Sequence, residues 1–237
     1  MPLIEFDKDL PKSLDTTNKQ VKWVKKLALE HLGSACKRLD RAPFQGMFSR
    51  TFFLALVNGD EVALQFRTER LDLEAFRVAR AALGAVVPES TALESEELQG
   101  QGAWAYAFTR MPGQMWLRGI EGKGDKGRIA ICKSLGRIFS RGCLAASSEG
   151  AVGRLRLHLE AIAASTAEKV LPFRDEARRF LGRLDDLANL PLWVTHYDLN
   201  EVNVLIDEHC EVTALVDWEL STPRPSHLLA HSGSDPP

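Results

Sequence analysis

Apolar residues recur at helical spacing near the start of the chain. A helix is predicted over residues 16–33, because its apolar positions fall three or four residues apart and share one face. The stripe consists of Val21, Val24, Leu27, Ala28 and Leu32. Thr16 or Thr17 can cap the first turn, and Gly33 stands where a helix commonly ends. The simplest interpretation is a helix packed against a core.

The next pattern is typical of β-strands. The stretch SRTFFLALVNGDEVALQFR, residues 49–67, has two apolar runs on either side of Asn58-Gly59-Asp60, which predicts a hairpin. Helical spacing returns in LDLEAFRVARAALG and predicts a helix ending at Gly84. A further strand is predicted in AWAYAFTRMPG, closing at Pro112-Gly113.

The character of the chain changes after that strand. GIEGKGDKG, residues 119–127, is rich in glycine and charge and is interpreted as a loop. Helical segments are predicted from Ile129 onward, over residues 155–164 and over residues 173–187, and an apolar hairpin over residues 203–217. A β-rich part followed by a helical part predicts an α+β fold with two lobes and a hinge near residues 109–120.

Composition excludes several classes of protein. With 237 residues, 45% hydrophobic and 26% charged, the chain is an ordinary globular protein with a sizeable core. A net charge of −2 and a pI near 6.3 give no electrostatic footprint for nucleic acid or membrane. A small molecule or a protein is the expected partner.

The cysteines and the N-terminus favour the cytoplasm. The four cysteines are widely spaced with no CxxC pair, so they indicate neither a metal site nor a disulfide framework. MPLIEFDKDLPKSLD lacks the basic flank and apolar core of a signal peptide, and no run is long enough to span a bilayer. We therefore expect a cytoplasmic protein.

Chemically useful side chains gather around the last hairpin. If Leu205 faces Leu215 across it, Asn203 faces Asp217 on the same side of the ribbon, where paired Cβ atoms lie about 4.5–5.5 Å apart. An amide oxygen and a carboxylate at that separation can both reach one hard cation. The inference depends on the turn, because a slip of one residue would place the two on opposite faces.

The residues before the hairpin add a second pattern. His196-x-Asp198, with Asn203 five residues after the aspartate, has the spacing of the catalytic loop of kinases. In that loop the aspartate takes the proton of the acceptor hydroxyl and the asparagine binds magnesium, and a second magnesium-binding aspartate follows the next strand. Asp217 stands in that position.

Together HYDLNEVNVLID and VTALVDWE resemble the aminoglycoside phosphotransferase family, small-molecule kinases with a protein-kinase-like fold. The resemblance covers roughly residues 40–222 and looks most like fungal members. It implies that Asp198 is the catalytic base and that His196 orders the loop. It also implies that Asn203 and Asp217 bind Mg²⁺, that ATP is the co-substrate and that the acceptor is a hydroxyl-bearing small molecule.

The same resemblance implies a nucleotide site upstream, with departures from the family pattern. Gln65 stands where the third strand usually has Lys or Arg, and Arg67, two residues on, projects from the same face and is the expected substitute. Glu74 is its expected partner, with Glu69 as the alternative. Gly46 and Ser49 are the candidates in a glycine-poor nucleotide loop.

The resemblance also divides the chain. The expected parts are a helical N-terminal extension (1–39), a nucleotide-binding N-lobe (40–112), a C-lobe with the catalytic loop and metal-binding hairpin (113–222) and a disordered tail (223–237). Only 18 residues follow Asp217-Trp218-Glu219, where the family continues with helices, so the chain is interpreted as truncated. A lobe without those helices is expected to expose apolar surface.

Two alternatives to an active kinase stay open. One is an inactive pseudokinase or partner-binding remnant, favoured by Gln65 and by the short C-terminus. The other is a metal-dependent hydrolase that uses His196, Asp198 and Asp217, for which one histidine and two carboxylates form a poor ligand set. The acceptor and the oligomeric state do not follow from the sequence.

Overall fold

The structure is a computed structural model that describes residues 4–144, 148–187 and 190–218. The chain forms two compact units. One unit comprises Met1–Arg137 together with His196–Pro237, and the other comprises Ile138–Thr195. The predicted tail over residues 223–237 lies outside the described residues, and the predicted boundary between residues 112 and 113 stays a prediction.

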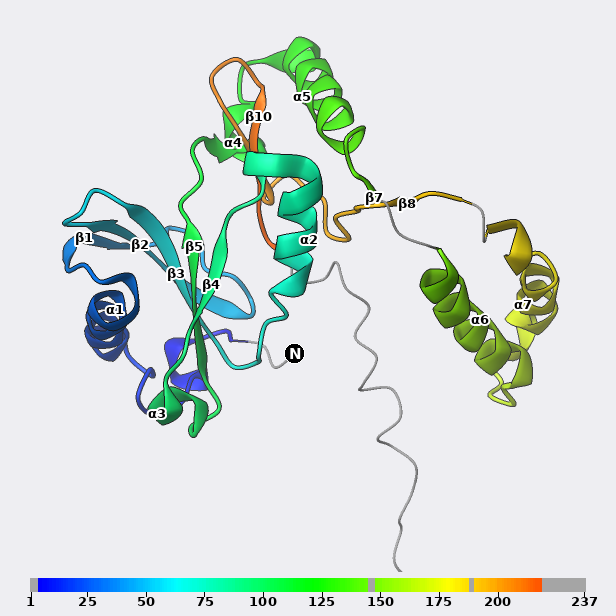
Figure 1. Ribbon diagram of the computed structural model, residues 1–237, viewed down its shortest axis with the longest axis horizontal. Coiled ribbons are helices and arrows are strands. Elements are labelled where there is room, and N and C mark those ends of the chain that lie inside the picture. The colour runs from blue at the N-terminus through cyan, green and yellow to red at the C-terminus, as the bar shows by residue number, and fades with distance from the viewer. Residues whose placement is uncertain (1–3, 145–147, 188–189, 219–237) are drawn as a thin grey trace, which may run out of the picture. The chain divides into compact units, whose positions relative to one another are not determined.

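The first unit is built on a five-stranded antiparallel sheet with strand order β1-β2-β3-β5-β4 (Figure 1). Its strands are β1 (Cys36–Arg41), β2 (Ser49–Leu56), β3 (Glu61–Arg67), β4 (Ser90–Leu93) and β5 (Trp104–Thr109). The predicted hairpin is confirmed, and Gly59 takes a φ of 97° in its turn, a conformation that glycine adopts without strain. Asn58 closes the turn by accepting a hydrogen bond from the backbone N–H of Asp60.

Helix α1 (Thr17–Leu32) covers one face of this sheet. Both predicted caps are observed: the Thr16 hydroxyl accepts a hydrogen bond from Lys19 N–H, and Gly33 is left-handed with a φ of 64°. The side chains that form this core are buried Ile4, Leu10, Leu14, Trp23, Val24, Leu27, Phe52, Leu54, Leu64 and Phe66, among others. The segment before α1, with the short 3-10 turn η1 (Asp7–Asp9), contributes three of them.

Helix α2 (Glu74–Leu83) covers the opposite face. Its Phe76 ring lies 5.1 Å from the ring of Phe108, whereas the neighbouring residue Ala107 belongs to the α1-side core. Because successive strand residues point to opposite faces, the two helices pack on different sides of the sheet. The elements that complete this part are η2 (Gly84–Val86) and α3 (Glu96–Gln99).

One boundary of the predicted N-terminal extension is wrong. Residues 36–39 are not part of a helical segment but begin β1, which pairs with β2 at the edge of the sheet. The strand alternates weakly and carries several charged residues, so its sequence lacks the apolar period that marks β2 and β3. Only pairing with β2 makes it a strand.

A second, three-stranded sheet follows in the order β10-β9-β6. Its strands are β6 (Gln114–Met115), β9 (Val204–Ile206) and β10 (Val212–Leu215), and helices α4 (Trp116–Gly119) and α5 (Gly124–Phe139) lie in the same part of the chain. The predicted loop over residues 119–127 is wrong at its end, because α5 begins at Gly124. A Cβ on Gly127 would lie 3.2 Å from Cys210 Sγ, so this glycine permits close packing of the helix on the β9–β10 turn.

The second unit contains the remaining helices and a short ribbon. Its elements are β7 (Cys143–Leu144), α6 (Glu149–Ala164), η3 (Leu171–Phe173), α7 (Arg174–Leu181), η4 (Leu184–Leu187) and β8 (Leu192–Trp193). The predicted helix over residues 173–187 therefore ends early, at Leu181. Within α6 no residue is buried, and Leu157, Phe173 and Phe180 are exposed.

Candidate active site

The loop before β9 brings two predicted site residues together. Asn203 is buried directly before the strand, and its side-chain amide donates to the backbone carbonyl of Asp198 at 2.9 Å and to Asp198 Oδ2 at 3.1 Å. The five-residue spacing therefore closes a loop in which one side chain holds both the backbone and the carboxylate of the other. The amide oxygen of Asn203 is left as the atom of that side chain suited to a cation.

Asn200 is a residue of this site that the sequence interpretation missed. Its amide donates to Asp198 Oδ1 at 2.8 Å, and its oxygen accepts from the N–H groups of Val202 at 3.0 Å and Asn203 at 3.2 Å. Asp198 thus accepts a hydrogen bond on each carboxylate oxygen. The available signal was an asparagine two residues after the aspartate, since Asn readily bonds to backbone N–H groups two or three residues on.

His196 connects the loop to the end of the hairpin. Its Nε2 lies 2.7 Å from the carbonyl oxygen of Val216, and because a carbonyl only accepts, Nε2 carries the hydrogen. The ring is 7% exposed and lies 4.6 Å from the ring of Trp218. Burial lowers the pKa of His196 in spite of the Val216 hydrogen bond and the nearby Asp198 charge. Nδ1 has no hydrogen-bond partner among the described residues, which further disfavours its protonation.

The predicted register of the hairpin is wrong by one residue. Val204 pairs with Leu215 and Leu205 with Ala214, so Asn203 lies opposite Val216, whose N–H donates to the Asn203 carbonyl at 2.9 Å. Next to the turn the difference is two residues, because Val212 pairs with Ile206, and one extra residue of β10 between Val212 and Ala214 reduces it to one. A bulge of this kind is not visible in the apolar pattern that sets the expected register.

Asp217 has an unusual backbone conformation just after β10. It follows Val216 directly, is exposed and has a φ of 67°, a left-handed conformation that non-glycine residues adopt rarely. The direction of its side chain therefore does not follow from strand alternation. Asp217 lies one residue from the backbone that pairs with Asn203, at the same end of the hairpin as Asp198 and His196.

The predicted nucleotide-side residues of the sheet share a face. Ser49 pairs with Arg67 across β2 and β3, and Gln65 stands two residues from Arg67 on the same strand. Arg67 is 3% exposed, and its Nη1 donates to Gln65 Oε1 at 3.4 Å. Tyr106, opposite Gln65 on β5, accepts a hydrogen bond from Leu71 N–H at 2.6 Å. Burial raises the pKa of the Tyr106 phenol, so it stays neutral.

Glu74 has a different partner from the one expected. Its exposed carboxylate forms an ion pair with Arg77, one turn along α2, rather than with Arg67. Residues three apart on a helix are neighbours, so this contact forms within α2 and does not depend on the position of the sheet. Glu69, the alternative partner of Arg67, stays a prediction.

The loop between β1 and β2 contains the other two candidates. A Cβ on Gly46 would lie 2.8 Å from Ser49 Oγ, so the absence of a side chain at Gly46 makes room for that buried hydroxyl. Gln45 holds the base of the loop by bonding to the backbone of Ala42 and Thr51. At the other side of the loop, the Phe44 ring lies 4.5 Å from the guanidinium of Arg118 in α4.

A cavity of about 540 Å³ lies beside the start of α2, away from the hairpin. It is lined by the first turn of α2 with β4 and β5, and includes Glu74, Arg77 and Tyr106 but none of the residues around the hairpin. The described part of the chain also contains no group of three His, Cys, Asp or Glu placed to bind a metal. His196, Asp198 and Asp217, the residues of the hydrolase alternative, therefore do not form such a group.

Membrane insertion by a helix has no support in the described ranges. None of the helices there is both long and apolar enough to cross a bilayer.

Several known structures similar to this chain are phosphotransferases. A putative aminoglycoside phosphotransferase from Ralstonia eutropha JMP134 superposes with a TM-score of 0.58 at 18% identity, covering 85% of this chain and 65% of that one. A thermostable mutant of aminoglycoside phosphotransferase APH(4)-Ia, in ternary complex with AMP-PNP and hygromycin B, gives 0.51 at 19% identity, covering 83% and 70%. Macrolide 2'-phosphotransferase MphH from Brachybacterium faecium gives 0.51 at 20% identity, covering 84% and 71%.

At these identities the structural matches show the fold alone, and it is the predicted protein-kinase-like fold. No curated protein sequence matches the chain. The family model, in contrast, matches residues 40–227, which include most of the five-stranded sheet, the loop of Asp198 and Asn203, and the hairpin. The chain belongs to the phosphotransferase enzyme family.

Proposed function

We propose that the chain transfers the γ-phosphoryl group of ATP to a hydroxyl of a small molecule. The observation that carries the proposal is the pair of hydrogen bonds from Asn203 to Asp198, in a loop that His196 connects to the residue before Asp217. The family match supports phosphoryl transfer. The AMP-PNP and hygromycin B bound by one similar structure support ATP and a hydroxyl-bearing acceptor.

In this mechanism Asp198 accepts the proton of the attacking hydroxyl. Asn200 and Asn203 hold one carboxylate oxygen each, so the carboxylate is oriented before the acceptor arrives. Such orientation lowers the barrier because no side chain must reorganise in the transition state. His196 acts at a distance, by holding the loop against Val216.

The residues around the hairpin fit a magnesium ion by the chemistry of their donors. Asn203 offers an amide oxygen and Asp217 a carboxylate, and oxygen ligands are those that Mg²⁺ prefers. Bound there, the ion would neutralise charge on the phosphates. On the sheet side, Gly46, Ser49, Gln65 and Arg67 are the proposed nucleotide contacts. Glu74 is proposed with them at the start of α2, where its carboxylate pairs with Arg77. We expect the enzyme to act in the cytoplasm, where ATP is available.

A coupled ADP-release assay with MgATP and a panel of hydroxylated metabolites tests the proposal. The wild-type protein should release ADP with at least one acceptor, and Asp198→Asn should reduce turnover by about 10²- to 10⁴-fold. Asp60→Asn, in the exposed turn between β2 and β3, is the matched control and should keep full turnover. Titration calorimetry should show MgATP binding that is lost in Asp217→Ala.

An inactive remnant is the second candidate. Neutral Gln65 on β3 and the exposed apolar side chains of the Ile138–Thr195 unit favour it. The same assay separates the two functions: a folded wild-type protein that binds MgATP but releases no ADP with any acceptor would support the remnant. A folded protein that binds no MgATP would contradict the kinase proposal.

A further inference from the structure

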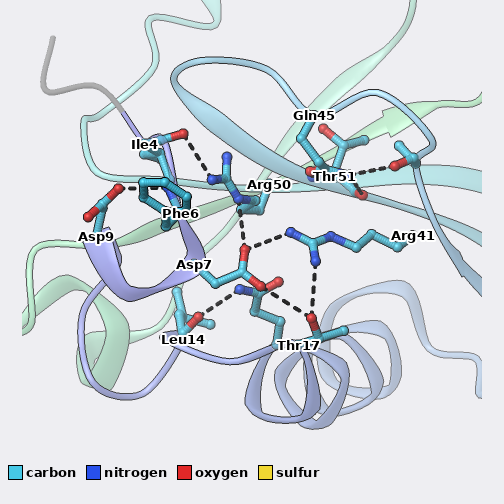
Figure 2. Close-up of polar contacts among 12 residues, drawn as sticks. Ile4, Phe6, Asp7, Asp9, Leu14, Thr17, Arg41, Gln45, Arg50 and Thr51 are labelled. Atoms are coloured by element: carbon cyan, nitrogen blue, oxygen red, sulfur yellow. Dashed lines mark hydrogen bonds and ion pairs between the residues drawn. The ribbon is translucent and has the colours of Figure 1, made fainter.

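One carboxylate joins both ends of the loop between β1 and β2. Asp7 Oδ1 accepts a hydrogen bond from Arg41 Nη2 at 2.6 Å and from Arg50 Nε at 2.9 Å (Figure 2). Arg41 is the last residue of β1 and Arg50 the second residue of β2, so the two arginines flank the loop. Thr17 completes the group, since its hydroxyl accepts from Arg41 and donates to Asp7 Oδ2.

The N-terminal segment holds Asp7 firmly in place. Ile4 and Leu10, on either side of it, are buried in the core between α1 and the sheet. Ile4 N–H donates to the carbonyl of Met47, within the loop, at 2.7 Å. The position of the carboxylate is therefore set by apolar packing as well as by its own hydrogen bonds.

Arg50 also binds the backbone of the loop directly. Arg50 is 3% exposed, and its guanidinium donates to the carbonyls of Gly46 at 3.2 Å and Ser49 at 3.0 Å. A third donation reaches the carbonyl of Ile4 at 2.9 Å. The C=O of Gly46 and the N–H of Met47 belong to one trans peptide and point in opposite directions. Since the Gly46 carbonyl faces the guanidinium, the Met47 N–H faces away from it. Figure 2 shows Arg50 between Ile4 and Asp7.

The charges make Asp7 essential to this arrangement. A buried guanidinium without a carboxylate is strongly unfavourable, and Arg41 and Arg50 repel each other unless a negative charge lies between them. Burial on its own would raise the pKa of Asp7, but the hydrogen bonds from Arg50 and Arg41 outweigh it and lower the pKa. Asp7 is therefore ionised at neutral pH, as its ion pairs with Arg41 and Arg50 require.

We propose that Asp7 is a positioning residue for the nucleotide loop, residues 42–48, and holds it in the conformation that binds the phosphates of ATP. The inference rests on the proposed function for its ligand, and on the geometry alone for its effect on the loop. Asp7 touches neither Asp198 nor the hairpin in any contact described above, so it acts through Arg41 and Arg50.

The experiment compares Asp7→Asn with wild type in two independent readouts. Hydrogen–deuterium exchange should show amides of residues 42–48 exchanging about tenfold faster in the variant. Calorimetry should show the Kd for AMP-PNP with Mg²⁺ rising about tenfold, while the Kd for adenosine, which has no phosphates, changes less than about twofold. The split between these two probes distinguishes a positioning role from general loss of structure.

Two further variants keep the test sharp. Asp15→Asn is the matched control, because Asp15 belongs to the same segment but pairs with Lys19, away from the loop, and should change neither readout. Arg41→Gln removes the ion pair between Arg41 and Asp7, and the Arg41 side chain is more exposed than that of Arg50. It should move both readouts in the same direction by a smaller factor, and it replaces Asp7→Asn if that variant does not fold.

The outcomes separate the two proposals. Unchanged exchange in residues 42–48 of a folded Asp7→Asn variant would overturn the inference, and so would equal weakening of AMP-PNP and adenosine. A wild-type protein that binds no AMP-PNP would refute the proposed function. In that case faster exchange in the variant would still support Asp7 as the residue that orders the loop.

Discussion

The Nε2–H group of His196 donates to the backbone carbonyl of Val216 at 2.7 Å, across 20 positions of the sequence. This bond holds the beginning of the loop before β9 against the backbone that follows β10, one residue before Asp217. The His196 ring also packs on Trp218. His196 is therefore a structural connection between the two halves of the predicted site.

Replacement of His196 should destabilise the protein. His196→Ala removes a buried ring, its contact with Trp218 and the partner of the Val216 carbonyl, a loss of about 2–4 kcal/mol in the free energy of unfolding. Urea denaturation followed by tryptophan fluorescence measures it. His209→Ala, at an exposed position in the β9–β10 turn, is the control and should change stability by less than about 0.5 kcal/mol. Equal stability of the two variants would contradict the role of His196.

The lowered pKa of His196 predicts a pH dependence of stability. Above pH 6.5, the ordinary value for histidine, the side chain is neutral in both the folded and the unfolded chain, and its contribution is fully present. As the pH falls below 6.5 the unfolded chain binds a proton there more readily than the folded chain, so the free energy of unfolding decreases. Denaturation at pH 7.5, 6.5 and 5.5 should give a smaller decrease for His196→Gln than for wild type. Parallel curves would show that His196 is not the titrating group.

Asn200 should matter for turnover more than for stability. Asn200→Ala frees Asp198 Oδ1 and removes the acceptor for two backbone N–H groups of the loop, so we expect turnover to fall by about tenfold or more. The unfolding free energy should fall by about 1–2 kcal/mol. Asn58→Ala removes a similar pair of contacts in the β2–β3 turn and should have a comparable stability effect with no loss of turnover. The ADP-release assay and thermal unfolding compare the two variants.

Gly113, before β6, should tolerate no side chain. Its φ is 103°, and a Cβ there would lie 2.9 Å from the Ile206 carbonyl oxygen and in contact with Thr213 Oγ1. Gly113→Ala should therefore cost about 2–3 kcal/mol of stability and lower the melting temperature. Gly136→Ala is the opposite control: no described residue lies within 4 Å of its Cβ position in α5, so it should stabilise by about 0.5–1 kcal/mol. A neutral Gly113→Ala would show that β6 does not approach β9 as described.

Local signals along the chain determined much of the fold. The caps of α1, the Asn58-Gly59 turn and the end of α2 each depend on residues within a few positions of one another, and all are observed. The five-residue spacing of Asp198 and Asn203 is local in the same sense, because a short loop closes it through one side chain. Chemistry of this kind is readable from the sequence since no distant segment takes part.

The tertiary structure decided what depends on distant contacts. The pairing next to the turn and a one-residue bulge in β10 together set the hairpin register, and the left-handed Asp217 lies outside strand alternation. Glu74 was expected to pair with Arg67 and pairs instead with Arg77, on its own helix. Asp7 and Arg50 are 43 positions apart, and only the packing of the N-terminal segment into the α1-side core brings them together. Such contacts depend on positions in space, which the order of residues does not specify until the core has formed.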